Sequence, residues 1–223
     1  MDSKILGLLF GRRRNNLKVH QLDANYASLR KRAWSQAIKI SIIFIGIMWT
    51  VFMLDLLLPF IDLNHYGIHP RHSGSLLGVI YTVFLHGSFS HLISNTLPLL
   101  FAITALFGNY PVTAKKVLIY GALLTGLLVW SFARSANHIG ASGLLYCLLT
   151  YIFVSGFFKK DVQSVGISLV IAFLYGSLLF GIIPDEQLVS WESHLFGFFA
   201  GLFLAWLYRK KDKPIYKSWD EEE

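Results

Sequence analysis

The chain has 223 residues, of which 54% are hydrophobic and 15% charged, and its mean hydropathy is +0.53. A single soluble core cannot bury that much apolar surface, so the composition excludes an ordinary water-soluble domain and indicates a membrane protein. The net charge of +7 would suggest a nucleic acid partner in a soluble protein, but nine of the 20 Lys and Arg residues precede residue 40 and five follow residue 208. Basic ends of this kind favour anionic lipid headgroups, so we expect the lipid bilayer as a partner and no nucleic acid.

The N-terminal residues and the single cysteine limit the chain further. A short apolar patch at residues 1–10 precedes Arg12, Arg13 and Arg14. This reverses the charge order of a secretory signal and predicts a retained, cytoplasmic N-terminus. Cys147 is the only cysteine, which rules out an intrachain disulfide and a zinc site made of several thiolates.

Six apolar runs have the length of membrane spans. In chain order they are Ile38 to Leu58, His91 to Phe107, Val117 to Ala133, Ser142 to Phe158, Val165 to Ile183 and Trp191 to Tyr208. The apolar stretch Leu76 to Leu85 is too short to cross a bilayer and is expected to be an interfacial or re-entrant element. We therefore expect an all-α membrane protein with a six-span domain at 38–208, a basic cytosolic extension at 1–37 and a charged cytosolic tail at 209–223.

Basic residues in the loops give the orientation, because cytoplasmic loops collect Lys and Arg. With both termini inside, the inner loops contain Lys115, Lys116, Lys159 and Lys160, and the outer loops contain only Arg71 and Arg134. In this topology the second, fourth and sixth runs all begin near the outer face. The polar residues that could take part in a reaction gather at the starts of these three runs.

The second run opens with polar side chains that lie on one helix face. His91 and Asn95 are four residues apart, so both side chains point the same way. Their N–H groups together could stabilise a negatively charged oxygen, as an oxyanion hole requires. Taken alone, hydrogen bonding between helices is the simpler explanation.

The fourth run opens at Ser142, within the sequence Gly140-Ala141-Ser142-Gly143. A helix N-terminus supplies free N–H groups and a positive dipole end, and the small neighbours leave room for a substrate backbone. These are the needs of a serine nucleophile. A helix-capping serine between packing glycines is the alternative, and only a partnered base favours the nucleophile.

The sixth run supplies that base, since His194 shares a helix face with Gly197 and Gly201. The missing side chains let this run approach another helix closely. If the neighbour is the fourth run, His194 reaches Ser142. Tyr146, one turn after Ser142, could pack its ring on the imidazole or be an ordinary core aromatic.

These motifs strongly resemble the rhomboid family of intramembrane serine proteases. The resemblance covers residues 38–208 and rests on Gly-Ala-Ser-Gly at 140–143, His-x-x-Gly-x-x-x-Gly at 194–201 and His-x-x-x-x-His-x-x-x-Asn at 86–95. It implies a six-helix fold in which Ser142 is the nucleophile and His194 the general base. It further implies that His91, Asn95 and the Ser142 backbone N–H are the oxyanion donors and that Tyr146 stacks on the base. Gly140 and Gly143 would lie beside the serine. His86 would lie near the active-site water or the turn before the second run.

One feature of the family is missing, because its first outer loop often carries a Trp-Arg pair and the nearest basic feature here is Pro70-Arg71. No third catalytic carboxylate is evident either. Asp55 lies at the outer end of the first run, and Glu192 lies on a different helix face from His194, so we expect a Ser-His dyad. Water would reach the site from outside, past a rim formed by Ser88, Ser90 and His138.

The implied activity is hydrolysis of peptide bonds in or near transmembrane segments of other membrane proteins, without metal or cofactor, by a multi-pass protein of a bacterial plasma membrane. Two other functions stay open. A non-catalytic rhomboid-like protein would bind membrane helices without cutting them, although such relatives usually lack the serine or the histidine. A metal-dependent membrane protein would use histidines and a carboxylate as ligands, but no His-Glu-x-x-His motif supports it; the candidate ligands are His86, His91, His138, Glu192 and His194.

Overall fold

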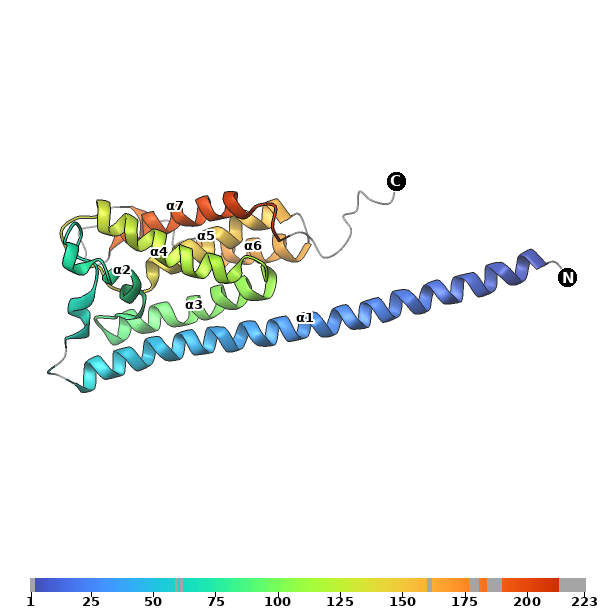
Figure 1. Ribbon diagram of the computed structural model, residues 1–223, viewed down its shortest axis with the longest axis horizontal. Coiled ribbons are helices and arrows are strands. Elements are labelled where there is room, and N and C mark those ends of the chain that lie inside the picture. Colours follow the sequence, from blue (N-terminus) through green and yellow to red (C-terminus); the bar gives the residue numbers. More distant parts are fainter. Residues whose placement is uncertain are drawn as a thin grey trace.

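The computed structural model describes residues 3–58, 60, 62–159, 162–176, 181–183 and 190–212. Its described residues are mostly helical and contain no strand, only one isolated β-bridge between Ile68 and His138. The longer helices pack into one bundle, and the N-terminal part of α1 projects beyond the others on the side where α7 ends (Figure 1). They are α1 (Ser3–Leu57), α3 (Phe89–Asn109), α4 (Ala114–Phe132), α5 (Ser142–Lys159), α6 (Val162–Tyr175) and α7 (Trp191–Tyr208). The expected all-α class is confirmed.

Within the described residues, four helices are long and apolar enough to cross a bilayer, namely Ser28–Leu57 of α1 and the whole of α3, α4 and α5. α6 is apolar but has 14 residues, and the run expected there continues through residues 177–180, which lie outside the described part. α7 has 18 residues, but its first turn contains the polar sequence Glu192-Ser193-His194. The count of six spans therefore stays a prediction.

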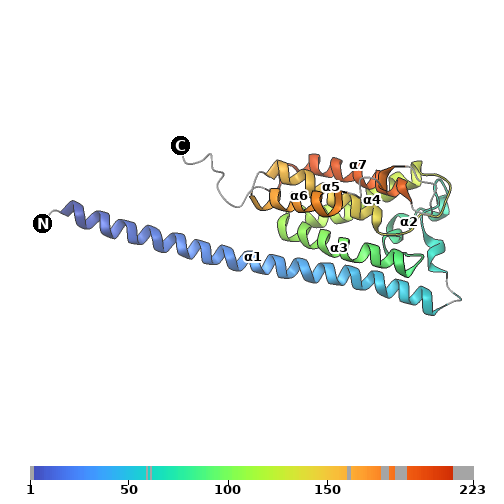
Figure 2. The same cartoon turned by 180° about the vertical axis from the view of Figure 1, so that it is seen from behind.

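α1 is a single helix of 55 residues, about 80 Å long at 1.5 Å per residue. It continues through the basic N-terminal sequence because residues 12–45 contain neither Gly nor Pro to interrupt it. Its apolar part lies beside α3 in both views (Figures 1 and 2). Two hydrogen bonds join the helices: the hydroxyls of Ser41 and Thr104 are 2.8 Å apart, and the Trp49 indole donates to the Thr96 hydroxyl over 3.1 Å.

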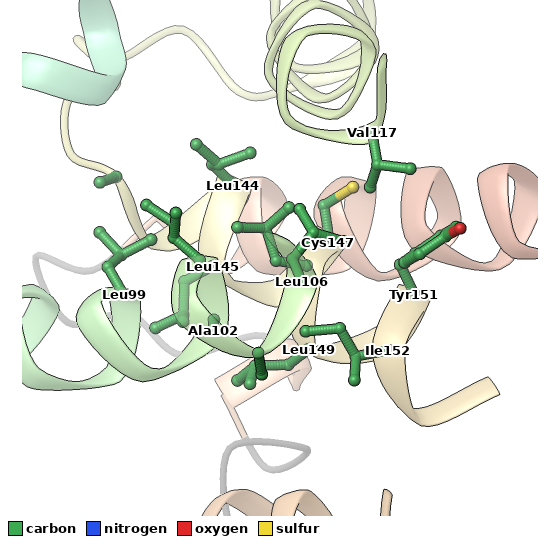
Figure 3. Packing of buried hydrophobic residues seen from close by; sticks show 14 of the residues in the cluster. Leu99, Ala102, Leu106, Val117, Leu144, Leu145, Cys147, Leu149, Tyr151 and Ile152 are labelled. Carbon is green, nitrogen blue, oxygen red and sulfur yellow. The ribbon is translucent and has the colours of Figure 1, made fainter. Parts of the chain in front are cut away.

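α5 is the central helix of the bundle. Of its residues 72% are buried inside the protein, compared with 17% for the most apolar stretch of α1. Figure 3 shows Leu145 and Leu149 of α5 close to Leu99 and Ala102 of α3, while Cys147 lies towards Val117 of α4. The helix that begins with Ser142 is therefore packed on several sides.

The chain between α1 and α3 forms short helical turns. They are η1 (Leu63–Tyr66), η2 (Ser73–Ser75), α2 (Gly78–Tyr81) and η3 (Thr82–Phe84). The apolar stretch 76–85 lies within these turns and is too short to span a bilayer, as expected. α2 packs directly on α4, because a Cβ atom added to Gly126 would lie 2.9 Å from Cγ1 of Val79.

Arg71 of the first loop meets Trp130 near the end of α4, although the two residues are far apart in sequence. Arg71 has a positive φ of 65°, and its backbone N–H donates to the Trp130 carbonyl over 2.9 Å. Its Nη1 donates to the Ala133 carbonyl over 2.8 Å. The Trp130 indole N–H donates in return to the His72 carbonyl over 3.0 Å. The loop is thereby fixed to the end of α4.

The opposite end of the bundle is joined by long-range polar contacts. Asp212, just after α7, accepts hydrogen bonds from the Val112 backbone N–H over 3.0 Å and from the Thr113 hydroxyl. Its carboxylate therefore satisfies donors at the start of α4, where anions are favoured. Lys159, counted among the loop charges, is instead buried and donates to the Asn109 carbonyl over 2.7 Å.

Candidate active site

The starts of three helices converge at the end of the bundle where α1 ends. Ser142 is the first residue of α5, His194 is the fourth residue of α7, and His91 is the third residue of α3. All three helices begin at this end (Figure 1). Each N-terminus carries N–H groups without intrahelical partners and a partial positive charge. The site thus forms where backbone donors are free and the electrostatic potential favours a developing anion.

The Ser142 hydroxyl and the His194 imidazole lie within hydrogen-bonding distance, with 2.9 Å between Oγ and Nε2. Glycines on both helices allow this approach. A Cβ atom on Gly197 would lie 2.1 Å from the Gly143 carbonyl oxygen, and one on Gly201 would lie 2.5 Å from the Cys147 carbonyl oxygen. The helix face of His194, Gly197 and Gly201 therefore does contact the helix of Ser142.

Two further contacts fix the His194 ring. The Tyr146 ring stacks on it, with 4.2 Å between centroids and 7° between planes. On the other edge, Nδ1 is 2.9 Å from the Gly181 carbonyl oxygen. A carbonyl can only accept, so Nδ1 carries the proton and Nε2 presents its lone pair to the Ser142 hydroxyl. This is the tautomer that a general base needs.

Gly140 and His91 are in direct contact beside the serine. Gly140 has a φ of 113°, a conformation that L side chains rarely adopt. A Cβ atom there would lie 2.6 Å from Nε2 and Cε1 of His91. The imidazole therefore lies over the backbone two residues before Ser142, which is possible only with glycine at this position. Oxyanion donation by His91 remains a prediction.

Asn95 is buried, with 2% of its surface exposed. Its Nδ2 donates to the carbonyl of His91, one turn back, over 3.0 Å. This bond uses one of the two amide protons and holds the side chain at the start of α3. Whether its second proton serves an oxyanion is likewise a prediction.

His86 packs edge-on against His91, with 5.0 Å between ring centroids and 63° between planes. Its Nδ1 is 3.4 Å from the Phe84 carbonyl oxygen, and its buried Nε2 has no hydrogen-bond partner among the described residues. Burial, helped by the nearby His91, lowers the pKa of His86 to about 4. The ring is neutral at physiological pH and contributes to the wall behind His91.

His138 does not line an open rim, contrary to expectation. Only 2% of its surface is exposed, because its backbone pairs with Ile68 and its ring bonds to Ser190 and to the Arg134 carbonyl. Ser88 and Ser90 are exposed, as expected of rim residues. Ser190 and Gly181 were missed by sequence analysis. A lone N-cap serine is a common local pattern, and a backbone acceptor has no residue-type signature.

The carboxylate closest in sequence to the base is engaged elsewhere. Glu192 forms an ion pair with Arg134, 3.4 Å between Oε1 and Nε, while the His194 Nδ1 bonds to a carbonyl. Within the described part of the chain, no three His, Cys, Asp or Glu side chains are grouped as metal ligands. The five candidate ligands of the metal hypothesis are thus divided between His-Ser, His-His and Glu-Arg contacts.

The helical bundle, its bilayer-length spans and this polar cluster define an integral membrane protein. A family model described as the Rhomboid domain matches residues 73–211. Uncharacterized proteins of Mycobacterium tuberculosis and Mycobacterium bovis are each 36% identical over 174 residues, covering 74% of this chain and 72% of the relative. An uncharacterized protein of Mycobacterium leprae is 32% identical over 174 residues, covering 74% of this chain and 68% of the relative. The chain belongs to the rhomboid family, which confirms the resemblance.

Proposed function

We propose that the chain is an intramembrane serine endopeptidase that hydrolyses peptide bonds in or near transmembrane segments of other membrane proteins. The observation that carries this proposal is the 2.9 Å contact between the Ser142 Oγ and the His194 Nε2. Family membership alone does not decide it, because the family also includes inactive members. A hydroxyl facing the unprotonated nitrogen of a fixed imidazole is the arrangement of an activated nucleophile.

In the acylation step the Ser142 Oγ attacks the carbonyl carbon of the scissile peptide bond. His194 Nε2 takes the hydroxyl proton and then gives it to the departing amine nitrogen, which leaves an acyl-enzyme. Water attacks the ester in the second step, with His194 again acting as the base. The dyad needs no carboxylate, since the Gly181 carbonyl already holds the imidazole in the required tautomer.

The negative oxygen of each tetrahedral intermediate needs donors. The Ser142 N–H begins α5 and has no intrahelical partner. The side chains of His91 and Asn95 come from the start of α3, and we assign them as the remaining donors. An oxyanion placed there is also favoured by the positive ends of two helices.

We further propose six spans with both termini in the cytoplasm and the protease unit at 38–208, between a basic extension at 1–37 and a charged tail at 209–223. In this topology the dyad lies about one turn below the outer face, where water can reach the acyl-enzyme past the exposed Ser88 and Ser90. Because the similar proteins are mycobacterial, the membrane is assigned as a bacterial plasma membrane. Substrates would be single-span membrane proteins.

The test is cleavage of a reporter with one transmembrane segment by the full chain in lipid vesicles. Ser142→Ala and His194→Ala are expected to give no product while the chain still folds and inserts into the membrane. Ser73→Ala, which changes an exposed serine of η2, is expected to cleave at the wild-type rate. Full activity in Ser142→Ala would reject the assignment.

The same assay separates the other functions. A non-catalytic helix-binding protein would bind the reporter without producing fragments in any variant. A metal-dependent hydrolase would lose activity in EDTA and keep it in a serine-directed fluorophosphonate. The serine protease is expected to show the reverse pattern.

A further inference from the structure

Two short segments that precede the nucleophile and the base are joined to each other. His138 lies four residues before Ser142, and Ser190 lies four residues before His194. The His138 Nδ1 and the Ser190 Oγ are 2.6 Å apart. A second link joins the same segments, since Arg134 pairs with Glu192 over 3.4 Å.

The His138 ring is held in one tautomer by its partners. Its Nε2 is 3.0 Å from the Arg134 carbonyl oxygen, which can only accept, so Nε2 carries the proton. Nδ1 must then accept the hydroxyl proton of Ser190. Burial lowers the pKa of His138, against an opposing effect of the Arg134 carbonyl and of Glu192, so the ring stays neutral.

Backbone contacts fix His138 as well. Its N–H and carbonyl pair with the carbonyl and N–H of Ile68 over 2.9 and 3.0 Å. The same carbonyl accepts from the Thr82 hydroxyl over 2.8 Å. Every polar group of this buried residue is therefore used, and the segment before α5 is tied to the first loop as well as to α7.

Ser190 is equally fixed on the side of α7. It is the N-cap of that helix, and its Oγ accepts from the Ser193 N–H over 3.3 Å. Since the Ser190 hydroxyl proton goes to His138, the neighbouring Ser193 hydroxyl at 2.7 Å donates to the Ser190 Oγ. Ser190 thus caps α7 and, through His138, also contacts the segment that leads into α5.

The Arg134 to Glu192 pair strengthens the connection electrostatically. The Glu192 side chain is 5% exposed and that of Arg134 is 42% exposed. Neither carboxylate oxygen has a hydrogen-bond partner among the described residues. A buried carboxylate requires compensation, so the guanidinium of Arg134 holds the first turn of α7 against the segment that leads into α5.

We propose that Arg134, His138, Ser190 and Glu192 form a clasp that sets the separation and alignment of Ser142 and His194. The proposal rests on the proposed function, and the four are positioning residues, because they act through the dyad. A nucleophile and its base tolerate little displacement, since a misplacement of about 1 Å can cost about a hundredfold in rate. The glycine contacts of α5 with α7 control how closely the helices approach, and the clasp controls the register of their first turns.

The first test measures kcat and KM with the reporter for His138→Leu, which keeps bulk but removes both ring bonds. We expect kcat to fall by about tenfold to a hundredfold while KM changes little. The matched control is His72→Ala, an exposed histidine in the first loop, with wild-type kinetics expected. A variant of His138 with a lower thermal midpoint but unchanged kcat well below that temperature would overturn the proposal.

The second test separates the two roles of Ser190, which are to cap α7 and to bond to His138. Glycine is nearly as good an N-cap as serine but has no hydroxyl, whereas threonine keeps both properties. Ser190→Gly is therefore expected to lose about tenfold in kcat, because the dyad loses one contact that aligns it. Ser190→Thr is expected to stay near wild type. Equal activity of the two variants would contradict the clasp.

A double-mutant cycle gives a readout that does not need activity. In the Ser142→Ala background, the thermal effects of His138→Leu and Ser190→Gly are expected to be non-additive, as for residues in one network. Additive effects would overturn the contact itself. If the wild-type chain cleaves no reporter but the thermal effects are coupled, the proposed function fails and the contact between the two segments stands. If the wild-type chain cleaves the reporter and the His138 and Ser190 variants keep full kcat, only the clasp fails.

Discussion

The imidazole of His194 donates its Nδ1 proton to the carbonyl oxygen of Gly181 across 2.9 Å. In a three-membered catalytic triad a carboxylate accepts that proton and fixes the tautomer of the histidine. Here a backbone carbonyl occupies the same place, and the closest carboxylate in sequence, that of Glu192, is paired with Arg134. A neutral acceptor orients the ring but stabilises its cationic form less than a carboxylate would.

Gly181→Ala should impair the base, because an added Cβ would lie 2.2 Å from the Tyr146 hydroxyl and 3.2 Å from the His194 Nδ1. Either the Tyr146 ring or the segment of Gly181 must shift, and both moves disturb the orientation of the His194 ring. We therefore expect kcat of reporter cleavage to fall by about a hundredfold. Gly176→Ala is the matched control, since nothing lies within 4 Å of a Cβ there. Loss of activity in both variants would indicate a general effect on this part of the chain.

Gly197→Ala should separate α5 from α7. The new methyl group would lie 2.1 Å from the Gly143 carbonyl oxygen and 3.1 Å from the Tyr146 Cβ, so the helices must move apart. We expect a destabilisation of about 1–3 kcal/mol, typical of overpacking, together with loss of cleavage. Thermal unfolding in detergent measures the first effect. The control is Gly46→Ala, on an open face of α1, which is expected to leave the thermal midpoint unchanged or slightly raised. A thermal midpoint equal to that of the wild type for Gly197→Ala would contradict the close contact between α5 and α7.

Stability should depend on pH through His86. Burial lowers its pKa in the folded chain from 6.5 to about 4, so below about pH 6.5 the unfolded chain binds a proton that the folded chain excludes. This contribution to stability is complete above pH 6.5 and is lost as the pH falls through 4. The difference corresponds to about 3 kcal/mol. Thermal midpoints at pH 7.5 and 4.5 are expected to differ less in His86→Phe than in the wild type, and an equal difference in both would refute the pKa assignment.

The contact of Asp212 with the start of α4 predicts a stability effect far from the dyad. Asp212→Ala removes the acceptor of the Val112 N–H and of the Thr113 hydroxyl. Charge-assisted hydrogen bonds of this kind contribute about 1.5–3 kcal/mol, so the thermal midpoint should drop while kcat at low temperature is retained. Lys211→Ala, next to it and exposed, serves as the control.

The sequence predicted helix boundaries well where an apolar run is flanked by polar residues. The run predicted at Trp191 to Tyr208 coincides with α7, and the one predicted at Ser142 to Phe158 differs from α5 by one residue. The start of α1 was not predictable in this way. Its helix extends from Ile38 back to Ser3. Most of this stretch is rich in charged residues and gives no hydrophobic signal, and only the lack of Gly and Pro from residue 12 onward favours helix.

Side-chain chemistry was predictable when residue type and spacing carried it. The spacing of His194, Gly197 and Gly201 indicated a close helix contact, and the structure places that face against α5. The contribution of Gly181 was not predictable, because any residue has a carbonyl. His138 was assigned to the rim from its position in the sequence alone, but its pairing with Ile68, 70 residues earlier, buries it.

The most direct measurement of the central claim is the site and rate of labelling by a fluorophosphonate, read by mass spectrometry of the full chain in lipid vesicles. The wild type is expected to carry one adduct on Ser142, formed equally fast in EDTA, and His194→Ala is expected to label at least about a hundredfold more slowly because the hydroxyl has lost its base. An adduct on another residue, or labelling of Ser142 at the same rate without His194, would contradict a serine nucleophile activated by the base on α7.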